Sequence, residues 1–449
     1  ALAGQPHRPC QRPHVGHLRS AVIGDAIARL LESQGYKVKS DTHVGDWGTQ
    51  FGVLLYALQQ VSPAVRMAIE DNPLVRYEEL YSQYNQAVED KTIAERMTER
   101  GWGQSTTEWG RILERGKEEF AKLERGNKEN RKIWQRVVAV SMRKLKESAD
   151  QLGLRPFDRH LGESFYEDEI RPIVELALTK GIARKTPDGA SVVDLSSDGL
   201  DEAVLLKSDG ASTYLLRDLA TIKYAKDTLH FSENLYVVDV RQAHHFKQLF
   251  RVAELLGFEG VGESRHIEFG FMTLPEGPMS TRKGTAVSLD GLVAEAWKRA
   301  NDIILEKNPH VAGRATIATQ VGVGALKYFD LSHHRRSDIV FRWEEVLAFD
   351  GNSGPYLQYT HARLKSILRK AGERIEKIKK IETALDAVEH RLLVTLLRLP
   401  EAIEDALADF VPNVLANYLY HLAKLASEFY HSHPVIPESD AVKRKARIT

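Results

Sequence analysis

The 449-residue chain has little cysteine, no excess of charge of either sign and no long apolar run. Its single cysteine, Cys10, excludes a framework of intrachain disulfides and favours a reducing compartment, so we expect a cytoplasmic protein. Lysine and arginine number 62, as do aspartate and glutamate, which excludes a uniformly basic nucleic-acid coat. No apolar stretch approaches the roughly 20 residues that a membrane-spanning helix needs. The composition is that of a globular protein with a large core.

The spacing of apolar residues predicts an α/β region in the first part of the chain. Apolar residues recur every four positions before Gly35, which predicts a helix that this glycine ends. These residues are Leu18, Val22, Ala26 and Leu30. The run NLYVVDV is typical of a buried strand, and a second helical pattern follows it. This alternation favours a parallel, doubly wound sheet. Further patterns predict strands near 36–40 and within 190–207, and helices at 214–225 and 244–256.

Two other regions have helical patterns only. Residues 62–150 are rich in Glu, Lys, Arg and Gln at helical spacing, and we interpret about 62–165 as a helical insertion. From about residue 350 onward the strand signals vanish and one helical pattern follows another. The segment FDGNSGP, with two glycines and a proline, marks a boundary. We therefore expect an α/β domain at 1–348 and an all-α domain at 349–449.

The segment HVGH, from His14 to His17, stands at the start of the first predicted helix. Free backbone N–H groups and the positive end of the helix dipole attract phosphate at such a position. Gly16 lets a ligand approach the backbone closely, and both imidazoles could donate hydrogen bonds to phosphate oxygens. On these four residues alone, a helix start with two solvated histidines is the simpler interpretation.

A second segment, PMSTRKG, runs from Pro278 to Gly284. Ser280 offers a hydroxyl, and Arg282 and Lys283 offer positive charge to a polyphosphate. The flanking glycines would let such a loop close over its ligand. Taken alone, this segment is equally an ordinary polar surface loop.

Together the two segments resemble the paired ATP signatures of class I aminoacyl-tRNA synthetases, His-Ile-Gly-His and Lys-Met-Ser-Lys-Ser. Longer stretches narrow the resemblance to the arginyl-tRNA synthetases. They are HVGHLRSAVIGDAIARLLESQGYKV, HVGDWGTQFG, SDGASTYLLRDLATIKYA, YVVDVRQAHHFKQLF and FDGNSGPYLQYTHARLKSILRKAG. The resemblance extends from about residue 14 to about residue 437.

This resemblance implies a class I Rossmann-like catalytic domain with a helical insertion, followed by an α-helical anticodon-binding domain. It implies an arginine–tRNA ligase that uses ATP to form arginyl-adenylate and then charges tRNA(Arg). The implied ligands are ATP, Mg²⁺ that enters with ATP, L-arginine and tRNA, and the expected state is a monomer without a membrane partner. Catalytic roles fall to His14, His17 and Lys283. The ATP-binding residues implied are His14, Gly16, His17, His245, Met279, Ser280, Arg282 and Lys283.

Recognition of arginine requires a carboxylate and planar acceptors in a fixed geometry. Asp218 lies four residues after Tyr214, so both share one face of the predicted helix. The resemblance implies that these two residues hold the guanidinium group and that Gln242 helps to hold the backbone end of arginine. The alternatives are a surface ion pair with Arg217 or a helix-end charge for Asp218, a core position for Tyr214, and an amide cap of the next helix for Gln242. A histidine at a helix start is likewise an alternative to the ATP role of His245.

The Gly-rich segment HVGDWGTQFG follows a predicted strand, so Asp46, Trp47 and Gln50 could face the same site. A packed turn is the alternative interpretation. The spacing of His7, Cys10, His14 and His17 could suggest zinc, but a tetrahedral site there would conflict with phosphate binding at His14 and His17. We therefore expect no zinc site.

The helical C-terminal region is locally basic. Residues 361–383 contain eight Lys or Arg against three Glu, and nearby tyrosines could stack on unpaired bases. From composition alone, a solvated charged face with buried aromatics is the simpler interpretation. Because the resemblance implies an anticodon-binding domain, the implied tRNA-binding residues are Lys365, Arg369, Lys370 and Tyr418.

The sequence departs from the family pattern just before HVGH. Arginyl-tRNA synthetases usually have an Asn that helps to bind arginine and a Lys that supplies charge, where this chain has Arg8 and Gln11. We expect weaker substrate binding, with Arg12 partly replacing the charge. The chain is also short for the family, so we expect truncation at both ends. Two alternatives therefore stay open, an impaired tRNA-binding synthetase fragment and a tRNA-independent HxGH nucleotidyltransferase.

Overall fold

A computed structural model describes most of the chain. The described residues are 2–3, 13, 15–87, 90–102, 111–258, 261–275, 277, 288–372 and 383–448. They divide into two compact units. The first consists of residues 1–24, 37–269 and 280–289, and the second of residues 25–36, 270–279 and 290–449.

The first unit contains a four-stranded parallel sheet with the order β2-β1-β6-β7. Its strands are β1 (Leu2–Ala3), β2 (Ser40–Asp41), β6 (Asn234–Asp239) and β7 (Ser264–Phe269). Leu2 is in register with Ser40 on one side and with Leu235 on the other. The sequence predicted the parallel sheet, but the strand expected near 36–40 is confined to its last residue and Asp41, and β1 was not predicted.

Helices pack against this sheet, as the alternating pattern predicted. They include α1 (Val15–Ser33) and α10 (Ala243–Leu256), whereas α8 (Glu167–Thr179) and α9 (Tyr214–Leu229) share a hydrophobic core with residues of β6. The Ser20 hydroxyl of α1 donates to the carbonyl of Val237 in β6 at 2.8 Å. Gly257 ends α10 with a φ of 74°, a left-handed conformation that glycine adopts without strain.

A small antiparallel sheet precedes α9 in the chain. Its strands are β3 (Ala183–Lys185), β4 (Ser191–Val193) and β5 (Ala203–Leu206). The last two confirm the strand signals within 190–207. The Thr213 side chain accepts from the N–H of Leu216 and so caps α9 at its start. This cap fixes where Tyr214 and Asp218 emerge from the helix.

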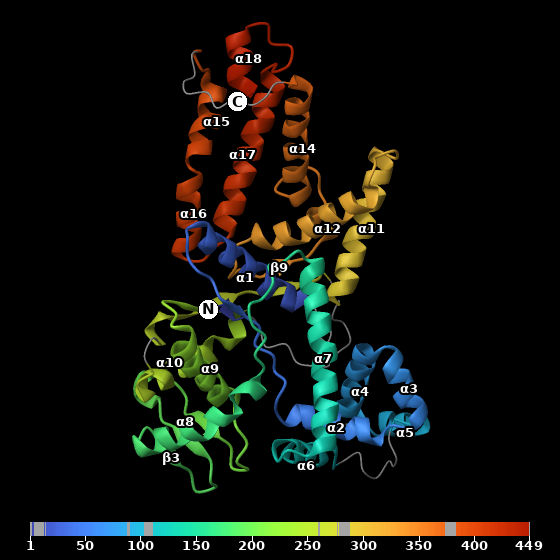
Figure 1. Ribbon diagram of the computed structural model, residues 1–449, viewed down its shortest axis with the longest axis vertical. Helices are drawn as coiled ribbons and strands as arrows, with labels where there is room; N and C mark the ends of the chain where they lie inside the picture. The colour runs from blue at the N-terminus through green and yellow to red at the C-terminus, as the bar shows by residue number, and fades with distance from the viewer. Residues whose placement is uncertain are drawn as a thin grey trace. The chain divides into compact units, whose positions relative to one another are not determined.

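The region between β2 and α8 is helical, as predicted (Figure 1), but its helices begin at Thr49, before the predicted start at about 62, and they enclose a core of their own. Its helices are α2 (Thr49–Gln60), α3 (Pro63–Asp71), α4 (Pro73–Ala87), α5 (Lys91–Glu99), α6 (Ile112–Glu124) and α7 (Lys128–Gln151). Helices α2 and α6 meet at Gly52 and Gly116, where a Cβ added to Gly52 would lie 1.9 Å from the Gly116 carbonyl oxygen. Only glycine permits this approach.

The second unit is almost entirely helical. Its helices beyond residue 288 are α11 (Leu289–Lys307), α12 (Arg314–Leu331), α13 (Trp343–Val346), α14 (Gly354–Ala371), α15 (Ala387–Leu397), α16 (Leu399–Ala408), α17 (Asn413–Ser432) and α18 (Ala441–Ile448). Two short strands, β8 (Met272–Thr273) and β9 (Ile339–Val340), pair in parallel. Helices α14 and α15 pack along α17 (Figure 1). None of the described helices is long and apolar enough to span a membrane.

Candidate active site

The order of strands in the parallel sheet reverses between β1 and β6. From β1 the chain passes through α1 to β2 on one side, whereas β6 and β7 lie on the other side. Ligands of open α/β sheets bind outside the carboxyl ends of the strands at such a switch point. The residues that follow those ends therefore mark the candidate site. They are His43 after β2, His17 at the start of α1, and Gln242 and His245 after β6.

Asp218, in the second turn of α9, lies between two imidazoles. Its Oδ2 is 2.6 Å from Nε2 of His245, and its Oδ1 is 3.4 Å from Nε2 of His43. The carboxylate is 21% exposed, so a ligand can reach it. The alternative that Asp218 forms a surface ion pair with Arg217 is wrong, because Arg217 is buried and binds Glu163.

Further carboxylates surround His43. Burial raises the pKa of Asp41 and of Asp46, and His43 is one of the groups that oppose this rise. Burial likewise raises the pKa of Glu163, against the opposing charges of Arg217 and His43. With Asp218, four carboxylates thus act on one imidazole. Such a concentration of acidic groups favours a cationic ligand.

Arg217 connects the acidic groups to Tyr214. Its Nη1 donates to Oε2 of Glu163 at 2.5 Å, and its Nε donates to the Ser212 hydroxyl at 3.1 Å. The guanidinium carbon lies 5.6 Å from the centre of the Tyr214 ring, within the range of a cation–π contact. Tyr214 is 52% exposed, so the alternative of a core aromatic is wrong.

Gln242 is the last residue of the short 3₁₀ helix η4 (Val240–Gln242) and stands at the cap position of α10. Within the described structure its side chain makes no capping hydrogen bond. The alternative of a capping amide is therefore wrong, and the partly exposed side chain stays a candidate for substrate binding. His245 lies in the first turn of α10, where its bond to Asp218 gives it a partner that the sequence did not predict.

The two phosphate signatures are only partly described. Gly16 and His17 lie in the first turn of α1 and are partly buried. The other predicted residues of these signatures lie outside the described residues, as do all the residues before HVGH on which the zinc and charge arguments rest. They are His14, Met279, Ser280, Arg282 and Lys283, and His7, Arg8, Cys10, Gln11 and Arg12.

Three residues of the segment after β2 were proposed to face the site, and two of them, Asp46 and Trp47, belong to a packed turn. Asp46 is buried and accepts from the backbone N–H and the hydroxyl of Ser164 at 2.9 and 2.7 Å. Trp47 packs edge-on against Phe120 and Trp134 of the helical insertion. Gln50 is exposed.

Of the residues predicted to bind tRNA, the three cations differ from the tyrosine. Lys365, Arg369 and Lys370 are exposed on α14. The hydroxyl of Tyr418 in α17 donates to the carbonyl of Thr395 in α15 at 2.9 Å. Tyr418 therefore joins two helices, whereas the cations remain accessible to a phosphate backbone.

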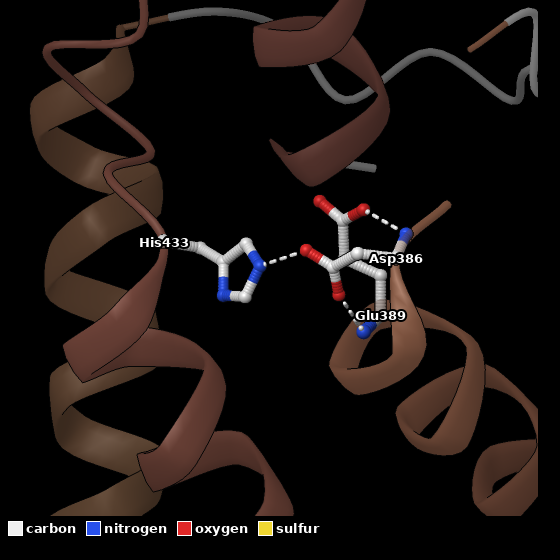
Figure 2. Close-up of side chains that lie close together, drawn as sticks. All are labelled: Asp386, Glu389 and His433. Carbon is white, nitrogen blue, oxygen red and sulfur yellow. Dashed lines mark hydrogen bonds and ion pairs between the residues drawn. The ribbon is translucent and has the colours of Figure 1, made fainter. Parts of the chain in front are cut away.

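Within the described residues, one group of side chains has the spacing to hold a metal ion: Asp386, Glu389 and His433, in the second unit (Figure 2). Asp386 Oδ1 accepts from the N–H groups of Val388 and Glu389 at 2.8 and 3.0 Å. The Glu389 carboxylate in turn accepts from the Asp386 N–H at 3.1 Å, which completes a capping box at the start of α15.

The same carboxylates also bind side chains from other elements. His433 hydrogen-bonds Oδ2 of Asp386 (Figure 2). Arg447 of α18 donates to Oε1 of Glu389 at 2.8 Å and to Glu438 at 2.7 Å. We call Asp386, Glu389, His433 and Arg447 the cap cluster. Its carboxylate oxygens already accept hydrogen bonds that hold the start of α15, so the ordinary role of this cluster is structural.

We call His43, Glu163, Arg217, Asp218 and His245 the site cluster. Sequence reasoning singled out Asp218 and His245 but missed His43 and Glu163. His43 begins the segment HVGDWGTQFG, two residues after the end of β2, and this position is the signal in the sequence that points to it. Nothing local to Glu163 indicates that it binds Arg217, 54 residues away.

Comparisons with known proteins agree with this architecture. An arginine–tRNA ligase of Chloroflexus aurantiacus is 37% identical over 443 residues, which cover 98% of this chain and 73% of the relative. One of Fusobacterium nucleatum is 36% identical over 97% of this chain and 74% of its own length. The solved arginyl-tRNA synthetase of Thermus thermophilus superposes with a TM-score of 0.81 at 27% identity, covering all of this chain and 78% of that one.

Two family models match the chain. Residues 10–343 match the catalytic domain of class I tRNA synthetases of the arginine type, and residues 357–449 match the DALR anticodon binding domain. The first match covers most of the chain and includes the whole site cluster. The chain therefore belongs to the arginyl group of class I tRNA synthetases.

Proposed function

We propose that this protein is an arginine–tRNA ligase, which activates L-arginine with ATP and transfers it to the 3′-terminal adenosine of tRNA(Arg). The observation that carries this proposal is the position of Asp218. This partly exposed carboxylate lies beside the switch point of the parallel sheet, within a group of acidic side chains suited to a guanidinium cation. The family to which the chain belongs supports the same reaction.

In this proposal the arginine side chain binds along the exposed face at the start of α9. The carboxylate of Asp218 accepts two N–H groups of the guanidinium, and the ring of Tyr214 packs beside it. The amide of Gln242, at the carboxyl end of β6, holds the backbone end of the substrate. That placement directs the arginine carboxylate toward the start of α1, where ATP would bind.

In the first step a carboxylate oxygen of arginine attacks the α-phosphorus of ATP, and the bond to pyrophosphate breaks. The N–H groups at the start of α1, together with His14 and His17, stabilise the charge that develops on the phosphate. Gly16 leaves room for the nucleotide, and His245 contributes to its binding. Met279, Ser280, Arg282 and Lys283 hold the departing pyrophosphate. Mg²⁺ enters with ATP, and we assign it no protein ligand.

In the second step a ribose hydroxyl of the terminal adenosine loses its proton and attacks the acyl carbon, and AMP leaves. We propose that residues 1–348 carry this chemistry, with an insertion at about 62–165, and that residues 349–449 bind the anticodon region. The exposed cations Lys365, Arg369 and Lys370 would contact the phosphate backbone, with Tyr418 nearby. We also propose that the enzyme acts as a monomer in the cytosol.

The test is charging of total tRNA with radiolabelled arginine by the full chain. Charging with arginine and not with lysine supports the proposal, because only a planar guanidinium fits a forked arrangement of acceptors. tRNA binding without charging would instead support an impaired synthetase. ATP–pyrophosphate exchange without tRNA or arginine would support a tRNA-independent nucleotidyltransferase.

A further inference from the structure

The two imidazoles of the site cluster contact Asp218 unequally. His245 lies 2.6 Å from Oδ2, a short hydrogen bond, whereas His43 lies 3.4 Å from Oδ1, beyond the usual length of a good one. Each oxygen of the carboxylate thus faces one histidine. The contact of His43 is the weaker of the two, and Oδ1 is the oxygen that a ligand can take over at lower cost.

Both histidines face Asp218 through Nε2, so a neutral imidazole in this position has its proton on Nε2 and leaves Nδ1 unprotonated. A neutral His43 is a weak donor that a guanidinium displaces easily. A protonated His43 is a cation at the place where the cation of arginine must bind. The two forms of His43 therefore affect arginine in opposite ways.

Other titratable groups around His43 strengthen this competition. Those that act on it or on Asp218 come from several elements: Asp41 of β2, Asp46 after β2, Glu163 and Tyr166 of η2 (Glu163–Tyr166), Asp218 of α9, Tyr236 of β6 and His245 of α10. Arg217 neutralises part of Glu163. The remaining acidic groups attract any cation, whether an imidazolium or a guanidinium.

Resting on the function proposed above, we propose that His43 makes the binding of arginine depend on pH. It competes with the arginine guanidinium for Oδ1 of Asp218, and only its neutral form admits the substrate. His245 serves as the fixed anchor that orients the carboxylate through Oδ2. Binding of arginine to a protonated site consequently releases the proton of His43 to solvent.

The main test measures KM for arginine, KM for ATP and kcat in aminoacylation between pH 5.5 and 8.0, for the wild type and for His43→Gln. The amide of glutamine supplies a donor in place of Nε2–H but does not titrate. In the wild type, KM for arginine should rise as the pH falls, by up to about tenfold per pH unit for one displaced proton. In His43→Gln the rise of KM for arginine should lose the part that is due to one displaced proton. KM for ATP should be unchanged.

His244→Gln is the matched control. His244 precedes His245 on α10 but faces Asp201, and its imidazole is 52% exposed. Its variant should keep the wild-type profile. His43→Ala removes the competing donor and its charge together, so KM for arginine should not rise near neutral pH and should lose the same part of its pH dependence as in His43→Gln. Equal pH profiles for wild type and His43→Gln would overturn the inference.

A second readout does not depend on catalysis. Titration calorimetry of L-arginine at pH 6.0, in two buffers of different ionisation enthalpy, counts the protons released on binding. The wild type should release a measurable fraction of one proton, and His43→Gln less. If arginine binds and both proteins release equal numbers of protons, the role of His43 is contradicted but the proposed function is not. The absence of arginine binding at every pH contradicts the proposed function as well.

Discussion

Two clusters in this protein are built from the same four residue types and serve different ends. Each joins an aspartate to a histidine and a glutamate to an arginine. The pairs are Asp218–His245 and Glu163–Arg217 in the site cluster, and Asp386–His433 and Glu389–Arg447 in the cap cluster. The difference lies in what else the carboxylates accept.

In the cap cluster the aspartate stands before the first turn of α15 and accepts two backbone N–H groups. Those donors would otherwise lack a partner in the helix, so the carboxylate is committed to the fold. Asp218 stands in the second turn of α9, where the backbone N–H groups already bond within the helix. Its contacts with His43 and His245 come from side chains, which a ligand can replace. A carboxylate that does not cap a helix is therefore the better candidate for substrate binding.

The largest difference between the two clusters should appear in the free energy of unfolding when their buried ion pairs are broken. Glu163 and Arg217 are 2% and 7% exposed, and Glu163→Gln leaves the guanidinium buried without its counter-charge. Breaking such a pair costs about 3–5 kcal/mol of folding free energy. The measurement is denaturant unfolding of the full chain, followed through the transition of the first unit.

Glu389→Gln is the matched variant in the cap cluster. Arg447 would keep its bonds to Glu438 and to the Pro434 carbonyl, so the loss of stability should be smaller than for Glu163→Gln. A larger loss for Glu389→Gln would show that the second contacts of Arg447 contribute little, and the contrast between the clusters would fail.

The next effect distinguishes the two aspartates by activity. Asp218→Asn should lower kcat/KM for arginine by about thirtyfold to several thousandfold, the range expected when a charged partner of a bound cation is neutralised. Asp386→Asn should leave kcat/KM within about twofold, because Asn also caps helices well. Steady-state charging assays measure both. A similar loss in the two variants would remove the distinction between site and cap.

The sequence predicted the elements that carry the site and part of the site itself. Helices α1, α9 and α10 and strand β6 follow from local periodicity and from glycine stops such as Gly257. The shared helix face of Tyr214 and Asp218 follows from their spacing alone. Each of these features depends on neighbours within a few positions, which a single sequence displays.

What the sequence did not predict depends on distant segments. Strand β1 has two residues, too few for a periodic pattern, and it is defined by pairing with residues near 40 and 235. His43 meets Asp218 across 175 positions, and its role is visible only when the carboxyl ends of neighbouring strands meet. The antiparallel pairing of β3 with β4 was missed for the same reason.

A smaller effect concerns the helix cap itself. Asp386→Ala removes the acceptor for the N–H groups of Val388 and Glu389 and should lower Tm by roughly 2–4 °C, as for the loss of an ordinary N-cap. Asp386→Ser retains a capping oxygen and should recover most of that loss. Differential scanning calorimetry of the three proteins measures it. An unchanged Tm for Asp386→Ala would mean that α15 does not need its cap.

The smallest effect is the titration of Asp386. The hydrogen bond from His433, aided by the N–H groups of Glu389 and Val388, lowers the pKa of Asp386 to about 2. A lowered carboxyl pKa stabilises the fold above the ordinary value of about 3.9, and this stabilisation is lost as the pH falls toward 2. His433→Leu removes the strongest of these contacts, so the pKa of Asp386 should rise but stay below 3.9, because the two backbone donors remain. The Tm difference between wild type and His433→Leu should accordingly shrink between pH 5 and pH 2, and carboxyl-carbon NMR shifts should report the pKa directly. An unaltered pKa of Asp386 in the variant would show that the backbone N–H groups alone lower it. The cap cluster would then bind its aspartate through the backbone, whereas the site cluster binds Asp218 through side chains, and the contrast between the two would be larger.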